Sequence, residues 1–417
     1  MHTICLYYYD LNKMKEKVHI FGKEIIDQGA IDQLYNCINS PEDIAVLTAD
    51  AHYGYNHPIG GAIAYKDKIS LSGVGFDIAC GNKAVKTNIK AEDIDVPKVM
   101  DEIFRRISFG VGRINNEPID HEVLEEIATT SFTPQRSMAK MAAEQLGTVG
   151  SGNHFVDLFE DDEGWLWIGV HFGSRGFGHR TTTGFMALSQ GLNFTDQPKQ
   201  SAMQDKPLLF DVNSTLGQDY IQALELAGKY AYAGRDIVVD KVLEIVGGKA
   251  SKEIHNHHNF AWKEEHFGEE YWVVRKGCTP AFPNQEGFIG ANMRDTSVIV
   301  EGVDSETSKK ALYSTVHGAG RILSRTKALG KTRWKKRGGK RVRTIISRGQ
   351  VNFDKVQAEL KEKNIYLRGG GADEAPECYK NLEEVLEYQG NTIKVKHRLY
   401  PIGVAMAGED IYDPYKD

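Results

Sequence analysis

Short apolar runs rich in valine, isoleucine and aromatic residues recur along the chain and predict β-strands. The runs occupy residues 44–50, 68–76, 165–172, 271–277, 297–303 and 394–406. Helical stretches lie between them, and the longest, residues 219–248, is closed by the pair Gly247 and Gly248. Strands and helices do not alternate regularly enough for a parallel doubly wound sheet. The pattern therefore predicts an α/β (α+β) fold with mixed or antiparallel β-sheets flanked by helices.

The remaining polar stretches contain no internal repeat, low-complexity tract or clear interdomain linker. Residues 193–214 are predicted to form a mobile loop. Acidic residues concentrate in two predicted helices, residues 121–127 and 381–388. At 417 residues the chain exceeds a typical domain, so it should bury a substantial core in one large unit or in two fused ones.

Composition is that of an ordinary globular protein, with 41% hydrophobic residues. No apolar stretch is long enough to cross a bilayer, and the first residues lack the basic-then-apolar order of a signal peptide, so we expect a cytoplasmic protein with no membrane partner. The five cysteines are odd in number, far apart and without a CxxC pair, which fits a reducing compartment better than a disulfide framework. Cys80 therefore needs an explanation of its own.

Charge is unevenly distributed along the chain. A formal net charge of -6 would argue against a nucleic-acid partner if it were evenly spread, but residues 321–348 are strongly basic. Such a run is most often a solvated loop. Because this one begins beside His317, contact with a phosphate backbone is the functional alternative. Trp334 within it could stack on a base or anchor the loop.

Metal-capable and nucleophilic side chains repeatedly fall in short turns that contain glycine. These residues are Asp50, His52, Asp77, Cys80, Asn153, His154, His171, His255, His257, His258 and His317. Turns of this kind bring the backbone close to a ligand or to another segment, and buried structural histidines rarely occupy them repeatedly. The pattern predicts one converging site.

The residue types indicate metal chemistry. Asp77 and Cys80 share a turn, so a carboxylate and a thiolate could face one ion, and a thiolate can bridge two ions. With His154, His171 and His258 there are ligands for two metals that keep open positions, as in a catalytic site. A single histidine or cysteine in such a turn is more often a hydrogen-bonded packing residue. The hypothesis rests on the five residues together.

His317 is followed by Gly318 and Gly320, which leave the imidazole face unhindered. A neutral imidazole nitrogen is a competent nucleophile toward phosphorus, and Arg321, one helical turn on, could neutralise charge on phosphoryl oxygens. The alternative is a histidine that caps a helix. Arg175, in GSRG, suits bidentate contact with phosphate. The chain contains no GxxxxGK[ST], GxGxxG or HExxH motif.

The chain resembles the RtcB-type RNA ligases over nearly its whole length, with the motifs in the family's order. They are ADAHYG, GVGFDIACGN, GTVGSGNHF, VHFGSRGFGH, HHNF, EEHFGEE, VVRKG, VHGAGRILSR and EAPECYKNLEEV. The resemblance implies one domain over residues 1–417, with sheets around a deep pocket for two manganese ions. It also implies GTP-dependent joining of an RNA 3′-phosphate or 2′,3′-cyclic phosphate to a 5′-hydroxyl, in RNA repair or tRNA splicing.

The resemblance also assigns roles by position. It implies that Asp77, Cys80, His154, His171 and His258 bind the metals, with Cys80 as the bridge. It implies that His317 becomes guanylylated, that Asn153, Arg175, Arg321 and Tyr379 contact nucleotide or phosphates, and that Asp50 is an acidic residue of the pocket. A thiolate by itself would favour zinc or iron, so manganese follows from the family and not from ligand softness. Some members of the family need a small activator protein called archease.

The chain departs from the family's pattern at several motifs. This chain has ADAH where the family has PDVH, FDIACGN where it has VDIGCGM, and GANMR at residues 290–294 where it has PGSMG. Ala407 occupies the place of a lysine that contacts the guanylate in the family. Because His317, Arg321 and all five implied metal ligands are kept, we expect a divergent branch that is still a ligase. The alternatives are a metal-dependent phosphoesterase without guanylylation and a non-catalytic RNA-binding protein.

Overall fold

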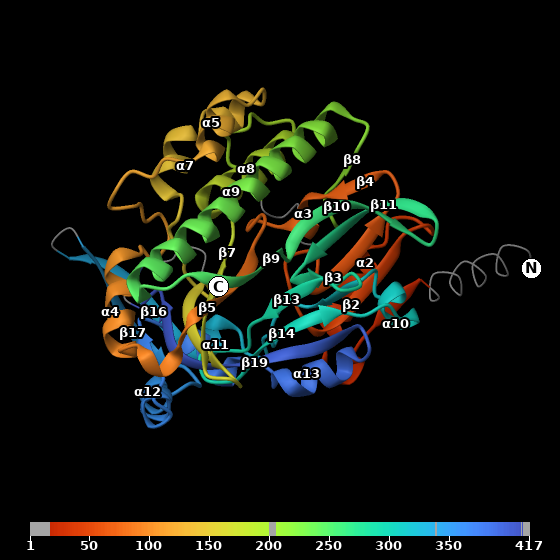
Figure 1. The fold of residues 1–417 in the computed structure, drawn as a ribbon. Helices are drawn as coiled ribbons and strands as arrows, with labels where there is room; N and C mark the ends of the chain where they lie inside the picture. The colour runs from red at the N-terminus through yellow and green to blue at the C-terminus, as the bar shows by residue number, and fades with distance from the viewer. Residues whose placement is uncertain (1–16, 200–205, 338–339, 410, 412–417) are drawn as a thin grey trace, which may run out of the picture.

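Two large sheets form the centre of the fold in the computed structural model, which describes residues 17–199, 206–337, 340–409 and 411 (Figure 1). The first sheet has the strand order β1 (Val18–Ile20), β2 (Ile44–His52), β3 (Ile59–Tyr65), β11 (Glu269–Lys276) and β10 (Asn259–His266). Only the β1–β2 pair is parallel in this sheet, and the other neighbours are antiparallel.

The second sheet has eight strands and carries most of the predicted site. Its order is β13 (Glu286–Ile289), β14 (Ser297–Gly302), β19 (Ile393–Met406), β6 (Phe155–Asp161), β7 (Trp165–Phe172), β5 (Gly81–Lys90) and β9 (Ala250–His257), with β18 (Tyr366–Arg368) beside β19. Only β18 pairs in parallel. Two-stranded sheets join β12 (Cys278–Pro280) to β15 (Ser314–Val316) and β4 (Lys68–Ser70) to β8 (Leu209–Asp211).

Helices flank these sheets. They are α2 (Gln28–Cys37), α3 (Leu71–Val74), α4 (Val96–Arg106), α5 (Glu122–Thr129), α6 (Thr133–Arg136), α7 (Ala139–Gln145), α8 (Arg175–Ser189), α9 (Thr215–Val246), α10 (Glu306–Lys310), α11 (Arg325–Leu329), α12 (Phe353–Glu362) and α13 (Leu382–Gln389), with 3₁₀ turns at Lys23–Ile25, Ala91–Asp93, Ala372–Glu374 and Pro376–Cys378. Mixed and antiparallel sheets with flanking helices confirm the predicted fold class. None of the helices in the described part of the chain could span a membrane.

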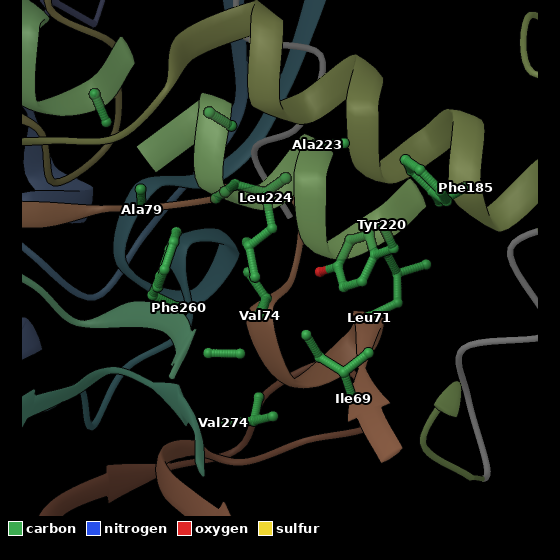
Figure 2. Packing of buried hydrophobic residues seen from close by; sticks show 14 of the residues in the cluster. Ile69, Leu71, Val74, Ala79, Phe185, Tyr220, Ala223, Leu224, Phe260 and Val274 are labelled. Carbon is green, nitrogen blue, oxygen red and sulfur yellow. The ribbon is translucent and has the colours of Figure 1, made fainter. Parts of the chain in front are cut away.

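Helix α9 connects two hydrophobic cores. Its side chains Tyr220 and Leu224 pack with α3, α8 and the first sheet (Figure 2). About one and two turns beyond Arg235, Val238 and Val242 belong instead to the core beneath the eight-stranded sheet. The Ser214 hydroxyl accepts a hydrogen bond from the Gly217 amide at the start of α9. One long helix therefore fixes the first sheet's core and the second sheet's core to each other.

Three predictions about local structure were wrong in part. The strand predicted over residues 68–76 ends at Ser70, because the Ser70 hydroxyl accepts a hydrogen bond from the Gly73 amide and starts α3. The predicted loop 193–214 contains strand β8, and its residues 200–205 lie outside the described part. Nor are residues 317–321 helical, so His317 caps no helix and Arg321 is not one helical turn on.

The basic run is not a loop. Its residues form α11 and a β-hairpin of β16 (Gly330–Arg337) and β17 (Lys340–Arg348), paired over their whole length. From Lys331 to Lys335, basic residues alternate with Thr332 and Trp334, which is the period of two that a strand requires. High charge concealed this strand pattern, because strands are usually recognised by alternating apolar residues.

Candidate functional site

A cavity of about 880 Å³ is lined by residues of both large sheets. Nine predicted site residues line it, namely His52, Asp77, Cys80, Asn153, His171, His258, His317, Arg321 and Tyr379. Three others lie just behind its wall: His154 contacts Cys80, Asp50 contacts His317, and Arg175 approaches Gly150 beside His154. The scattered turns therefore converge, as the sequence predicts. His255 and His257 are exceptions, since they pack around a buried arginine.

The histidines and the cysteine of the predicted metal site come from the ends of strands in the eight-stranded sheet. Cys80 immediately precedes β5, His154 precedes β6, His171 lies near the end of β7, and His258 follows β9. Strand β5 pairs with both β7 and β9, and Gly81 lies opposite the last residue of each. Antiparallel pairing thus brings segments that are distant in sequence to one edge of the sheet.

Two groups of potential ligands share Cys80. One comprises Cys80, His171 and His258, and the other comprises Asp77, Cys80 and His154, with all ligand atoms of a group within 4.8 Å of one another. The Cys80 Sγ lies 3.6 Å from Nε2 of both His154 and His171. The His154 Nε2 lies 2.9 Å from an Asp77 oxygen. A thiolate between two sets of nitrogen and oxygen donors is the donor arrangement of a bridged pair of cations.

Two glycines make room for these side chains. A Cβ at Gly173 would lie 2.2 Å from the Asp77 Oδ1, and a Cβ at Gly150 would lie 2.1 Å from the His154 Nδ1. Neither position tolerates a side chain without displacing a potential ligand. The glycines flanking the predicted site therefore serve close approach of backbone to ligand side chains.

Burial favours the neutral, metal-binding form of two imidazoles of this site, His171 and His258. It lowers the pKa of His171 and of His258 well below the usual range. Burial and the neighbouring Asp77 carboxylate raise the pKa of the Cys80 thiol well above its usual range. A bound cation reverses that preference, because a coordinating thiol is deprotonated. The Asp77 carboxyl behaves oppositely: despite burial, the His154 imidazole lowers its pKa.

Hydrogen bonds from neighbouring residues orient the potential metal ligands. The Asn82 Oδ1 lies 2.5 Å from the His171 Nδ1, so Nδ1–H donates to the amide and the Nε2 lone pair faces Cys80. Arg235 of α9 is fully buried. Its guanidinium donates to the carbonyls of Ala79 and Phe172, at 3.0 and 2.6 Å. Arg235 therefore connects the residues adjacent to two ligands, and neither it nor Asn82 was identified from the sequence.

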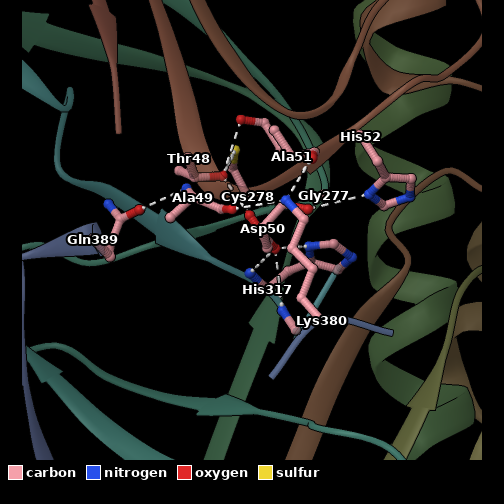
Figure 3. A network of polar contacts seen from close by, with 12 residues as sticks. Thr48, Ala49, Asp50, Ala51, His52, Gly277, Cys278, His317, Lys380 and Gln389 are labelled. Atoms are coloured by element: carbon pink, nitrogen blue, oxygen red, sulfur yellow. Dashed lines mark hydrogen bonds and ion pairs between the residues drawn. The ribbon is translucent and has the colours of Figure 1, made fainter. Parts of the chain in front are cut away.

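Asp50 and His317 form a buried pair beside the metal-ligand groups (Figure 3). One Asp50 oxygen lies 2.6 Å from the His317 Nδ1 and also accepts from the His317 amide at 3.0 Å. The other accepts from the Thr48 hydroxyl at 2.6 Å. Because Nδ1–H donates to the carboxylate, the His317 Nε2 keeps a lone pair for the cavity. The His317 and His258 ring centroids are 4.9 Å apart, so the His317 imidazole lies next to one of the potential metal ligands.

Close packing fixes the His317 turn. Gly320 has a φ of 78°, and a Cβ there would lie 2.0 Å from the Asp50 carbonyl oxygen. The Lys380 ammonium donates to the carbonyls of Ala49 and Ala51, on either side of Asp50, at 3.0 and 2.9 Å. The backbone of β2 and the turn after β15 are thus joined at the buried pair.

Arg321 is committed to a network with Tyr379. It donates to the Glu374 carboxylate at 3.2 Å, the Tyr379 hydroxyl at 3.0 Å and the Asp373 carbonyl at 2.7 Å. Its guanidinium also lies 5.0 Å from the centre of the Tyr379 ring. The Tyr379 hydroxyl in turn donates to Glu374. In this arrangement Arg321 positions the Tyr379 ring in the cavity wall.

Asn153 and Arg175 lie beside different members of the two ligand groups, Asn153 beside His171 and Arg175 near Gly150 and His154. The Asn153 amide donates to the His171 Nε2 at 3.4 Å. Arg175 is the first residue of α8 and has a φ of 54°, a left-handed conformation that is rare for arginine. Its side chain donates to the Gly110 carbonyl at 3.3 Å. Strain at a residue beside the site is a hallmark of functional constraint.

Comparison with known proteins identifies the family. The family model described as tRNA-splicing ligase RtcB matches residues 33–407. The chain belongs to the RtcB family. The RNA-splicing ligase RtcB of Escherichia coli strain K12 is 30% identical, over 90% of this chain and 93% of that protein. The tRNA-splicing ligases RtcB of Pyrobaculum aerophilum and Archaeoglobus fulgidus are 29% and 28% identical, over 94% and 92% of this chain and 92% of each relative.

One residue of the cavity was missed in the sequence. Asp157 of β6 lines the cavity, is 5% exposed, and its Oδ1 has no hydrogen-bond partner among the described residues. Burial raises its pKa well above the usual range, against one hydrogen bond from the Ala405 amide. In the sequence Asp157 occupies one position in an alternating strand and carries no turn or motif of its own. A buried, unsatisfied carboxyl in a cavity is a signal that only the structure provides.

Two departures from the RtcB pattern, the GANMR segment and Ala407, differ in whether they line the cavity. Gly290, Ala291, Asn292 and Met293 of the GANMR segment line the cavity. Ala407, in contrast, is 8% exposed and packs in the hydrophobic core beneath the eight-stranded sheet. The residue that replaces the family lysine is thus part of the apolar packing at the end of β19.

Proposed function

We propose that the chain is a GTP- and manganese-dependent RNA ligase that joins an RNA 3′-phosphate or 2′,3′-cyclic phosphate to a 5′-hydroxyl. The observation that supports this function most directly is the Asp50–His317 pair beside two ligand groups that share Cys80. A histidine with one nitrogen fixed by a carboxylate and the other free is suited to nucleophilic attack at phosphorus. The proposed ligase domain spans residues 1–417.

The proposed reaction has three steps. A cyclic phosphate end is first opened to a 3′-phosphate. The His317 Nε2 attacks the α-phosphate of GTP, pyrophosphate leaves, and Asp50 stabilises the positive charge that develops on the imidazole. The guanylate then passes to the RNA 3′-phosphate, and the 5′-hydroxyl displaces GMP. In this scheme Asn153 and Arg175 contact phosphates, and Arg321 positions Tyr379 against the nucleotide.

The donor set fits the two manganese ions of the proposal. Asp77, Cys80 and His154 would hold one ion, and Cys80, His171 and His258 the other. Bound there, the ions supply positive charge that stabilises phosphoryl oxygens as bonds to phosphorus change. Thiolate and imidazole ligands would bind zinc more tightly than manganese, so selection of manganese depends on supply.

Asp157 suits recognition of the guanine base. Guanine presents two adjacent donors, N1–H and the 2-amino group, to a carboxylate, whereas adenine presents an acceptor at N1. The free Oδ1 of Asp157 lies in the wall of the cavity that holds His317. The flanking residues 290–293 complete this part of the wall. The nucleotide preference for GTP would then come from a residue outside the motifs that identify the family.

The proposed substrates are broken RNAs in RNA repair or tRNA splicing, in a cytoplasmic setting. The relatives from Escherichia coli and Pyrobaculum aerophilum are named RNA-splicing and tRNA-splicing ligases, which supports an RNA substrate. An archease-like activator is a further proposed partner, taken from the family. With Ala407 in place of lysine, nucleotide binding lacks one cationic donor, worth about 1.5–3 kcal/mol, so we expect a high GTP requirement.

Covalent trapping tests this function. Incubation with manganese and radiolabelled GTP should give an acid-labile, alkali-stable protein adduct, because the phosphorus–nitrogen bond is acid-sensitive. His317→Ala should lack the adduct, whereas His121→Ala, at the start of α5 outside the cavity, should form it. Cleavage of cyclic phosphate without any adduct would favour the phosphoesterase. RNA binding without either reaction would favour the non-catalytic alternative.

A further inference from the structure

The β16–β17 hairpin projects from the body of the molecule on the side of α4 and α12 (Figure 1). Its base is firmly held. Ala328 of α11 is buried in a hydrophobic core, and a Cβ at Gly330 would lie 2.1 Å from the Ser347 carbonyl oxygen. Arg343 of β17 forms an ion pair with Glu409, which also accepts a hydrogen bond from the Ala372 amide. The hairpin is therefore fixed in direction at its root.

The two faces of the hairpin differ in chemistry. Trp334 lies directly opposite Arg343, so both belong to the face that contacts the body through Glu409. Lys331, Arg333 and Lys335 alternate with this face and are exposed. Among the described residues, none forms an ion pair or hydrogen bond with the side chains of these three.

A further exposed cation lies between the hairpin and the cavity. Lys327 of α11 is exposed and lines the cavity, and α11 leads directly into β16. Same-face residues on a strand are about 6.6 Å apart, so the three hairpin cations form an evenly spaced row. The chain has a net charge of -6, so a row of unpaired cations is opposite in sign to the rest of the molecule and favours an anionic partner. A repeating phosphate backbone has matching periodic charge.

We propose that Lys331, Arg333 and Lys335 form a binding surface for the RNA phosphate backbone, outside the catalytic cavity, that selects substrates with a long body beyond the broken end. This inference rests on the proposed ligase function for the identity of the RNA. Lys331 and Lys335 are about 13 Å apart along β16, the axial length of about four nucleotides of one strand in a duplex. RNAs that stop within the cavity cannot reach this surface.

The test compares binding of two RNAs with 3′-phosphate ends, one of about four nucleotides and one of about twenty. The variant is K331Q/R333Q/K335Q. For the long RNA its affinity should fall roughly 10–100-fold at low salt, and the slope of log affinity against log salt should decrease by about 2–3. For the short RNA both quantities should match the unmodified protein. The charge-matched control is K23Q/K140Q/K263Q, whose exposed lysines lie on other elements.

Two results would overturn the proposal. One is an unchanged affinity and salt slope for the long RNA, which would show that the hairpin does not bind RNA and would point to a partner of another class. The other is an equal loss for both RNAs, or for the control, which would indicate a general charge effect. Guanylylation with GTP alone should remain normal in the variant and serves as the check on folding. Failure of the unmodified protein to form the adduct contradicts the proposed function but leaves the binding comparison interpretable.

Discussion

Asp50 and Asp157 are two buried carboxyl groups at one cavity, and their surroundings shift their pKa in opposite directions. Burial would raise both, but the His317 imidazole and hydrogen bonds from His317 and Thr48 lower the pKa of Asp50. Asp157 has one backbone hydrogen bond to oppose burial, so its pKa is raised. Asp50 is thus kept ionised beside the proposed nucleophile. Asp157 is protonated in the absence of nucleotide, and the two donors of a guanine base would favour its ionised form.

Replacing Asp50 should separate orientation of His317 from metal binding. In Asp50→Asn the charge that orients and stabilises the imidazole is lost, so the rate of guanylylation should fall by about 10²–10⁴-fold. Bound manganese, measured by elemental analysis, should not change, because Asp50 belongs to neither ligand group. Thr48→Val removes one hydrogen bond to the other Asp50 oxygen and should cost no more than about tenfold. A normal rate in Asp50→Asn would contradict the role assigned to the pair.

Replacing Asp157 should weaken guanine selection while stabilising the fold. Because the folded carboxyl has a raised pKa, the folded protein binds more protons than the unfolded chain, and stability falls as pH rises from about 4 toward the raised value. Asp157→Asn removes this loss, so the Tm of the variant relative to the unmodified protein should increase as the pH rises above about 4. Adduct formation should need more GTP and discriminate less against ATP. An unchanged nucleotide preference would place base recognition elsewhere.

At the scale of elements, α9 links packing to the proposed site. The sequence predicts a helix over residues 219–248, closed by a glycine pair, and the structure has it at Thr215–Val246, yet Arg235 within it resembles a surface arginine in sequence. Only the structure shows that Arg235 is enclosed and that its donors meet the carbonyls beside Cys80 and His171. Pairing partners 156 residues apart cannot be derived from the local pattern of either segment. Strand positions follow from local periodicity, but the contacts between strand ends do not.

Arg235→Gln and Leu224→Ala test whether α9 supports the metal ligands specifically. Leu224→Ala should destabilise the fold by about 2–5 kcal/mol through a cavity but should leave manganese affinity intact. Arg235→Gln leaves two buried carbonyls short of donors, at about 1–3 kcal/mol each, and should also lower manganese affinity by about 10–100-fold. Unfolding curves and metal titration separate the two effects. Equal metal affinity in the two variants would reduce Arg235 to a packing residue.

At the scale of the whole molecule, the site joins segments from residue 50 to residue 379, and the family motifs located nearly all of them. Nine predicted residues line the cavity. Cys80, His171 and His258 lie at strand ends of the eight-stranded sheet, whereas His317 follows β15 of a two-stranded sheet. The basic hairpin and Asp157 lay outside what the sequence could establish. The hairpin strands are charged and lack apolar alternation, and the burial of Asp157 depends on β19 and β7, its neighbours across the sheet.

Because the proposed ligands lie on segments distant in sequence, metal binding should stabilise the whole fold. A ligand at one hundred times its Kd that binds only the folded state stabilises by about 2.7 kcal/mol, so manganese should raise the Tm measurably. Cys80→Ser weakens both ligand groups at once and should abolish most of this shift. Cys37→Ser alters another buried cysteine, which donates to the Asn56 carbonyl outside the ligand groups, and should keep the shift. Differential scanning fluorimetry over a manganese series makes the comparison. A full shift in Cys80→Ser would show that the thiolate does not bridge the ions, whatever the effect on ligation.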